Sequence, residues 1–227
     1  MKITGLTINC MEYKQAFWMS SASANQVYNN RFCILVRIMT DAGIVGVGEA
    51  DYPGGPPSSV VSVLEKELGP ALIGKDPLNV QAIWDDMYYM HIQHSRVGIH
   101  MHAISGIDIA LWDLFGKMVH QPVAKLLGQH FDRIPSYASG GFYQAGKGFD
   151  ELRAELEGYM EKGYRDAKIK IGRNLDRPGN PLHYMRFQDA AVSVEADYQR
   201  VAIAKEVVGS GRLLVDSNAS WDSCTAI

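Results

Sequence analysis

The stretch Ala167-Lys-Ile-Lys-Ile-Gly172 places two lysines, Lys168 and Lys170, one residue apart in a short run that is typical of a β-strand. Side chains in a strand alternate between its two faces, so both ammonium groups point the same way. The alanine and the isoleucines between them point the other way, into apolar packing. Two like charges on one face of a buried strand are unfavourable unless a site uses them. Each cation disfavours protonation of the other, so one lysine could act as a base near neutral pH.

The same spacing has a structural explanation. Lysines on a solvated strand face, or on a strand edge where they oppose aggregation, would be placed in the same way. The spacing taken alone favours this explanation, because structural charges outnumber functional ones.

A second short strand further along the chain changes that balance. Leu213-Leu-Val-Asp-Ser-Asn218 is an apolar run that ends in Asp216. A carboxylate at the C-terminal tip of a parallel strand is well placed to hold a hard divalent cation through oxygen. Asn218 could orient that ligand or touch a substrate oxygen. A strand followed by an ordinary Asp/Ser/Asn turn is the structural alternative. The two strands together indicate a site more strongly than either one alone.

Composition narrows the class of protein. The chain has 227 residues, enough for one large or two small domains, and its net charge of −3 offers no basic field for nucleic acid. No apolar run reaches the length needed to span a membrane. The cysteines Cys10, Cys33 and Cys224 are scattered and odd in number, which favours a reducing compartment over a disulfide framework. We therefore expect a cytoplasmic protein without nucleic-acid or membrane partners.

The first part of the chain predicts a hairpin followed by helices. Residues 2–10 read as a strand, and 31–39 with 44–50 read as an antiparallel hairpin. The segments 13–30 and 51–57 read as loops, and loops of this length are often functional. The expected helices run from Ser58 or Ser59 to about Leu68, over Leu78–His91, over Met101–Met118, and in a short turn between Pro122 and Gly128. The small residues Gly106 and Ala110 would allow a close contact of the third helix.

After residue 132 the pattern alternates between strands and helices. Strands are expected at Ile134–Ser139, 166–171 and Leu213–Asp216, and helices at Phe149–Lys162 and Val194–Val208. Such alternation predicts parallel strands joined by crossover helices. The polar stretch 173–189 leaves the lysine strand at the end where such folds place active sites. Ser139 and Tyr143 follow the first of these strands and could line the site, although residues at such positions are more often loop residues.

Over nearly its whole length the chain resembles the enolase superfamily, specifically its mandelate racemase and muconate-lactonizing enzyme family. The motifs that carry the resemblance are Thr40-Asp-Ala-Gly-Ile-Val-Gly-Val-Gly-Glu49, Ala103-Ile-Ser-Gly-Ile-Asp-Ile-Ala-Leu-Trp-Asp-Leu114, Gly116-Lys117, Pro122-Val-Ala-Lys-Leu-Leu-Gly128, Lys168-Ile-Lys170-Ile-Gly172 and Val215-Asp-Ser-Asn218.

The resemblance implies an α+β capping domain at residues 1–130, followed at 131–227 by the first strands, about three, of a (β/α) TIM-type barrel. A whole barrel takes about 250 residues, so the barrel is incomplete in this chain. We expect the sequence to be the N-terminal part of a longer chain and the 227-residue piece alone to be inactive. The remaining metal ligands and the second acid/base would lie beyond Ile227.

The resemblance also implies a chemistry. Such enzymes bind Mg²⁺ and remove the proton alpha to a substrate carboxylate through an enediolate intermediate. Carried over by position, Lys170 is the candidate base, Lys168 its tuning neighbour, Asp216 a metal ligand and Asn218 a substrate-binding residue. Acid-sugar dehydration is the first expectation and racemisation or epimerisation the next. The expected partners are a small carboxylate substrate and further copies of the chain in a homo-oligomer.

Two other functions stay open. One is a muconate-type cycloisomerase, and the other is a non-catalytic binding or assembly protein that retains the fold. A separate metal site among His91, His94, His100 and His102 is disfavoured, because no cysteine or well-spaced carboxylate accompanies them in the sequence.

Overall fold

The computed structural model describes residues 1–20, 27–52, 57–93, 96–144, 146–172 and 193–218. Contacts divide the chain into two compact units. The first comprises Met1–Tyr13 and Asn30–Asp132, and the second comprises Lys14–Asn29 and Arg133–Ile227. The sequence had suggested one boundary at residue 130 and had not anticipated that Lys14–Asn29 belongs with the second unit.

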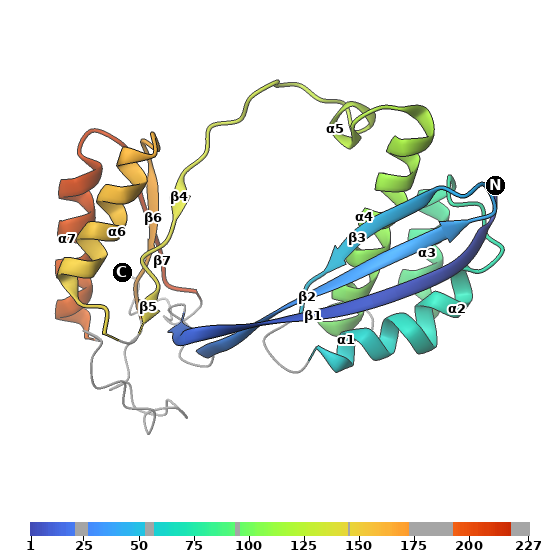
Figure 1. The fold of residues 1–227 in the computed structure, drawn as a ribbon, viewed down its shortest axis with the longest axis horizontal. Helices are drawn as coiled ribbons and strands as arrows, with labels where there is room; N and C mark the ends of the chain where they lie inside the picture. The colour runs from blue at the N-terminus through green and yellow to red at the C-terminus, as the bar shows by residue number, and fades with distance from the viewer. Residues whose placement is uncertain (21–26, 53–56, 94–95, 145, 173–192, 219–227) are drawn as a thin grey trace. The chain divides into compact units, whose positions relative to one another are not determined.

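The first unit is an antiparallel sheet with helices packed on one face (Figure 1). Its strands are the first part of β1 (Ile3–Ser20), the last part of β2 (Val27–Thr40) and β3 (Val45–Ala50). Its helical segments are α1 (Ser58–Val63), the π-helical η1 (Leu64–Leu68), α2 (Gly69–Leu72), α3 (Val80–Met90), α4 (Ile99–Val119) and α5 (Val123–Leu126). Alternate residues of β2, Ile34, Val36 and Ile38, are fully buried against the helices. The predicted hairpin and helices are therefore present.

Helix α4 and strand β3 approach each other backbone to backbone. A Cβ atom on Gly48 would lie 2.1 Å from the carbonyl oxygen of Gly106, and one on Gly46 would lie 2.1 Å from that of Ala110. Glycine is required at both strand positions because any side chain would separate the two elements. The close contact that the small residues of this helix allow is thus made with a strand.

Side chains of α4 also cover the free edge of β3. The amide of Val47 donates to Asp113 Oδ2 at 2.7 Å, and Lys117 Nζ donates to the carbonyl oxygen of Val45 at 2.9 Å. Lys117 and Asp113 are joined by a 2.6 Å ion pair. An uncovered edge strand is a template for aggregation, so these bonds protect the sheet as well as attach the helix.

Two expectations for the first unit were wrong. The segment 13–30 is not a loop throughout, because β1 continues to Ser20 and β2 begins at Val27; residues 21–26 lie outside the described part. The helix that follows the second loop begins at Ser58 with Pro57 at its N-cap position, so neither serine is the cap, and helical structure continues through η1 to Leu72.

The second unit holds a parallel sheet. Its strands β4 (Ala138–Ser139), β6 (Ala167–Lys170) and β7 (Leu213–Asp216) lie in the order β4-β6-β7 with both pairs parallel. Helices α6 (Phe149–Glu161) and α7 (Val194–Val208) cover one face of it (Figure 1). Ala167, Ile169 and Ile171 are buried against these helices, so the apolar face predicted for the lysine strand is confirmed.

Two details of the second unit depart from the sequence. The strand expected at Ile134–Ser139 is reduced to its last two residues, and Ile134 is 80% exposed. An unpredicted strand, β5 (Tyr143–Gln144), pairs antiparallel with the end of β1 at Met19 and Ser20. The expected loop 173–189 lies outside the described residues.

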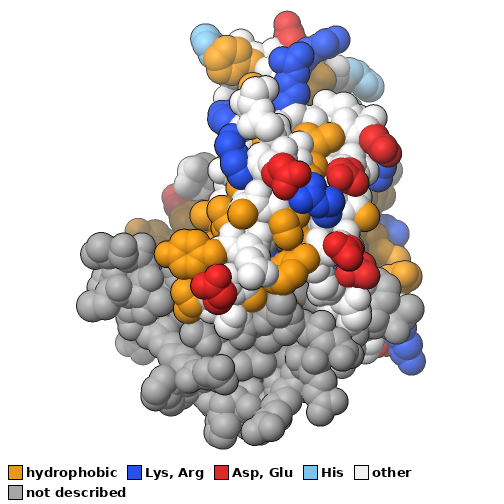
Figure 2. Space-filling view, turned by 90° about the vertical axis from the view of Figure 1, so that its left-hand side faces the viewer, with side chains coloured by type: hydrophobic (Ala, Val, Ile, Leu, Met, Phe, Trp, Pro, Cys, Tyr) orange, Lys and Arg blue, Asp and Glu red, His pale blue; other side chains and the backbone are white. Residues whose placement is uncertain are grey.

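Two further observations concern the surface. Acidic and basic side chains are interspersed among apolar ones on the face of the second unit that is turned to the viewer in Figure 2. No helix of the described part is long and apolar enough to cross a membrane.

Candidate functional site

The register of the parallel sheet brings the lysine strand and the aspartate strand together. Lys170 lies directly opposite Asp216, and Lys168 lies opposite Leu214. Because Lys168 and Lys170 share a face, both ammonium groups reach the same carboxylate: each Nζ lies 2.8 Å from Asp216 Oδ2. Lys170 also donates to Asn218 Oδ1. The structure thus places all four predicted site residues in one cluster.

Lys170 is the most enclosed member of the cluster. Its side chain is 9% exposed, whereas those of Lys168 and Asp216 are 24% and 25% exposed. The ring of Phe142 lies 5.5 Å from its Nζ, a distance at which an ammonium is attracted to an aromatic face. A buried ammonium with oriented acceptors is the kind of group that active sites use.

Asn218 holds the aspartate in place through its backbone. Its amide donates to Asp216 Oδ1 at 2.9 Å, and its φ of 46° lies in the left-handed region, which asparagine tolerates better than most residues. The two oxygens of Asp216 are therefore held separately, Oδ1 by this turn and Oδ2 by the lysines.

Charge in the cluster is dominated by the carboxylate. Hydrogen bonds from Lys168 and then Lys170 hold the pKa of Asp216 far below its usual range. The hydrogen bond to Asp216 in turn raises the pKa of Lys168 above its usual value. The expectation that the paired cations suppress each other's protonation is wrong for Lys168, because a carboxylate lies between the two ammonium groups and outweighs their repulsion.

Two oxygen-bearing side chains of the cluster could serve as ligands of a hard cation, although they are too few for a whole metal site. The carboxylate of Asp216 and the amide oxygen of Asn218 are ligands that Mg²⁺ accepts, and Mg²⁺ usually keeps several waters beside one or two carboxylates. Within the described part of the chain, no group of three or more His, Cys, Asp or Glu residues could hold a metal ion. Asp216 therefore fits as one ligand of a magnesium site and does not make up a whole site.

A second, buried network lies beside the cluster and was missed by the sequence reasoning. Asp197 and Arg200 of α7 are 6% and 2% exposed. Tyr143 Oη donates to Asp197 Oδ1 at 2.7 Å, and the ring of Tyr143 lies 4.3 Å below the guanidinium carbon of Arg200. Tyr143 lies in β5 and in this buried network, so it is not the loop residue that was the commoner of its two expected roles. A signal was available, because Arg200 continues the four-residue spacing of the buried small or apolar residues Ala196, Ala204 and Val208.

Glu155 of α6 supports the same region. It accepts hydrogen bonds from the amide of Gly141 at 3.1 Å and from Tyr159 Oη at 2.7 Å, and it forms an ion pair with buried Lys147. Burial alone would raise the pKa of Glu155, but Lys147 and these hydrogen bonds outweigh it and lower the pKa. The carboxylate is thereby held in its ionised form.

Three histidines of the first unit lie beside carboxylates and do not converge on a metal site among the described residues. His91 and His100 each place Nε2 3.2 Å from the same oxygen of Glu67, and His102 lies 3.6 Å from Asp51. His94 lies outside the described residues. The observed contacts are with single carboxylates.

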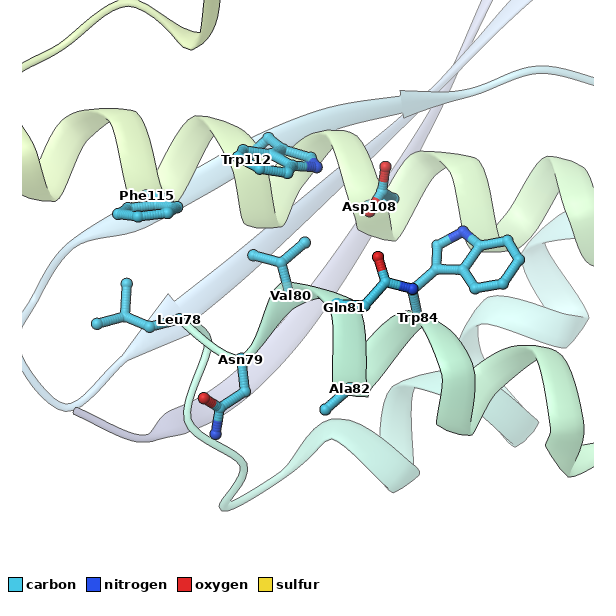
Figure 3. Close-up of a pocket in the computed structure, with 9 residues that line it drawn as sticks. All are labelled: Leu78, Asn79, Val80, Gln81, Ala82, Trp84, Asp108, Trp112 and Phe115. Carbon is cyan, nitrogen blue, oxygen red and sulfur yellow. The ribbon is translucent and has the colours of Figure 1, made fainter. Parts of the chain in front are cut away.

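A groove of about 750 Å³ in the first unit contains none of the predicted site residues (Figure 3). It lies between the start of α3 and the middle of α4, and its aromatic lining comes from Trp84, Trp112 and Phe115. Asp108 projects into it, and burial raises the pKa of this carboxyl.

Comparison with known proteins assigns the family. Residues 7–128 match the mandelate racemase/muconate lactonizing enzyme N-terminal domain, and residues 151–227 match the enolase C-terminal domain-like family. Arabinonate dehydratase of Saccharolobus solfataricus is 34% identical over 82% of this chain and 45% of its own length. D-galactarolactone cycloisomerase of Agrobacterium fabrum is 30% identical over 100% of this chain and 54% of its own length.

Solved structures agree with these matches. A member of the enolase superfamily from Polaromonas sp. JS666 has a TM-score of 0.81 and 29% identity, and the match covers 100% of this chain and 54% of that one. The chain spans about half the length of the curated relatives it matches. The N-terminal domain model covers more than half of the chain and the second match continues the same superfamily, so the chain belongs to the mandelate racemase/muconate lactonizing enzyme family of the enolase superfamily.

Proposed function

We propose that this chain carries part of the active site of an enzyme that removes the proton alpha to the carboxylate of a small acid. A buried ammonium in contact with a carboxylate and an amide, at the carboxyl ends of parallel strands, supports the proposal. Lys170, in its neutral amine form, would take the proton and become an ammonium, and Lys168 would hold Asp216 through its own contact with the carboxylate. Asn218 would contact the substrate.

Sugar acids are the proposed substrate class. The relatives carry the names arabinonate dehydratase and D-galactarolactone cycloisomerase, so their reactions differ while their names point to sugar-derived substrates. We place dehydration first, racemisation or epimerisation second, and cycloisomerisation as the further alternative.

Magnesium is the proposed cofactor, with Asp216 as one ligand and further ligands from elsewhere in the protein. When bound, a divalent cation stabilises the negative charge that develops on the substrate carboxylate as the alpha proton leaves. This chain would contribute the positive charge of Lys168, the charge that Lys170 gains as it takes the proton, and an enclosed surface that limits water around Lys170. Charge stabilisation counts most in such a water-poor site.

We also propose an architecture for the full-length protein. β4, β6 and β7 would be the first strands of a (β/α) barrel, capped by the α+β unit and assembled as a cytoplasmic homo-oligomer. Parallel strands with crossover helices on one face are the building unit of such a barrel.

Exchange of the alpha proton tests the proposal. The full-length protein is incubated in D₂O with a panel of sugar acids, with and without Mg²⁺, and deuterium incorporation is followed by NMR. We expect exchange that requires Mg²⁺, is abolished in Lys170→Ala and persists in Lys162→Ala, a control at an exposed lysine. Stabilisation by Mg²⁺ should survive in Lys170→Ala and be lost in Asp216→Ala.

Two results would contradict it. Continued exchange on every acid in Lys170→Ala would remove Lys170 from the role of base. An absence of exchange and of any Mg²⁺-dependent stabilisation in the wild type would favour a non-catalytic protein that keeps the fold.

A further inference from the structure

The buried guanidinium of Arg200 donates hydrogen bonds to two backbone segments beside the lysine cluster. Its Nε and Nη2 lie 3.4 and 3.3 Å from the carbonyl oxygen of Lys170, and Nη2 also donates to the carbonyl oxygen of Gly141. Gly141 precedes Phe142, whose ring lies 5.5 Å from Lys170 Nζ. One side chain therefore joins the strand that bears the ammonium to the segment that covers it.

Asp197, one helical turn away on α7, holds the next part of the same strand end. Its Oδ2 accepts the amide hydrogen of Gly172 at 2.7 Å, and its Oδ1 accepts the hydroxyl of Tyr143 at 2.7 Å. Gly172 has a φ of 87°, in the left-handed region that favours glycine. The backbone is thus fixed both at Lys170 and two residues beyond it.

Packing alone does not call for charges at these two positions. The other buried positions of α7 are filled by Ala196, Ala204 and Val208. An apolar side chain at position 200 would pack against the strand without the cost of burying a guanidinium. The charged pair supplies directed hydrogen bonds to named backbone atoms, which an apolar side chain lacks.

We propose that Arg200 and Asp197 are positioning residues for Lys170. They clamp the backbone at Lys170, Gly172 and Gly141, so the ammonium stays between Asp216 and the phenylalanine ring. The consequence for catalysis rests on the proposed function, whereas the placement of the ammonium does not. The two parts can therefore be tested separately.

Chemical labelling tests the placement. The folded full-length protein is treated with acetic anhydride at a low molar ratio, and acetylation of each lysine is followed by mass spectrometry. Lys170 should react slowly in the wild type, because its amine is buried and bonded. In Arg200→Met and Asp197→Asn its rate should rise about tenfold, the scale of a local opening, while Lys168 and Lys205 change less than about twofold.

Arg153→Met is the matched control. Arg153 of α6 forms a two-pronged ion pair with Glu206 of α7, with N–O distances of 2.7 and 3.1 Å, so its removal also loosens α7. Among the described residues its side-chain hydrogen bonds go to Glu206 and not to the end of the lysine strand, so labelling of Lys170 should stay within about twofold of the wild type.

Two milder variants cover the case in which Arg200→Met does not fold. Arg200→Lys keeps the charge but offers a single donor point in place of the planar fork, and it should give an intermediate rise. Tyr143→Phe removes one partner of Asp197 and keeps the ring under Arg200. The proposal is overturned if labelling of Lys170 is unchanged in the folded variants, or if all lysines become more reactive in parallel.

Kinetics tests the catalytic part. With a sugar acid that the wild type turns over, Arg200→Lys should lower kcat by about a hundredfold and change KM by less than about threefold, because misplacement of a reacting group affects the chemical step. Wild-type kinetics in Arg200→Lys would refute the catalytic consequence. A wild type that exchanges no alpha proton would instead refute the proposed function, and the labelling result would still decide the placement.

Discussion

Substitution of Gly48 by alanine tests the backbone contact on which the first unit is built. The new Cβ would lie 2.1 Å from the carbonyl oxygen of Gly106, 2.7 Å from the amide nitrogen of Ala110 and 3.2 Å from its Cβ. An ordinary carbon–oxygen contact needs about 3.3 Å, so helix and strand must separate by roughly 1 Å. Such a separation would also strain the two bonds by which Asp113 and Lys117 attach the helix to the free edge of this strand.

The expected cost follows from overpacking. An extra methyl group in a well-packed core usually lowers the free energy of unfolding by about 1–3 kcal/mol. We expect a loss of about 3 kcal/mol here, because the new methyl group would clash with the backbone of two residues. With a urea m-value of about 2 kcal/mol/M, the unfolding midpoint should fall by about 1.5 M. Circular dichroism during urea unfolding measures this shift.

The control is the same substitution at an open glycine. Gly158 lies in the last turn of α6, and nothing approaches within 4 Å of a Cβ built there. Gly158→Ala should therefore raise the free energy of unfolding by about 0.5–1 kcal/mol through helix propensity. A loss of less than about 1 kcal/mol in Gly48→Ala would refute the close contact of β3 with α4.

Two further predictions concern carboxylates. Burial raises the pKa of Asp108 and penalises its charged form. Asp108→Asn should therefore raise the free energy of unfolding at pH 7 by about 0.5 kcal/mol after allowance for solvent screening. This gain should vanish below about pH 4, where the aspartate is protonated in both the folded and the unfolded state. Asp113→Asn on the same helix is its control and should instead lose about 1 kcal/mol, since it weakens bonds to Val47 and Lys117. Arg212 lowers the pKa of Asp166, so that pair stabilises the protein above the unfolded pKa and its contribution is lost as pH falls through the folded value. Asp166→Asn should therefore flatten the loss of stability between about pH 4 and pH 2 in acid titrations followed by circular dichroism, and an unchanged acid slope would contradict the role of this pair.

Local sequence patterns were enough to predict most helices and strands. Helix α7 and strand β7 occur at the predicted residues, Val194–Val208 and Leu213–Asp216, because periodicity and the flanking serine and glycine signals are local properties of the chain. Strands that depend on distant partners were not foreseen. The end of β1 pairs with β5 across more than a hundred residues of chain, as in Met19 with Gln144, and no local signal encodes such a pairing.

The sequence by itself determined that Lys168, Lys170 and Asp216 share one face of a parallel sheet, because side chains in strands alternate with period two and sequential βαβ strands lie side by side. Only the tertiary structure decided how their charges balance. Asp216 lies between the two lysines and raises the pKa of Lys168, where spacing alone had suggested suppression. Only the tertiary structure, too, brought Arg200 of α7 to the carbonyl of Lys170, because a hydrogen bond between a helix side chain and a strand end depends on how the two elements pack.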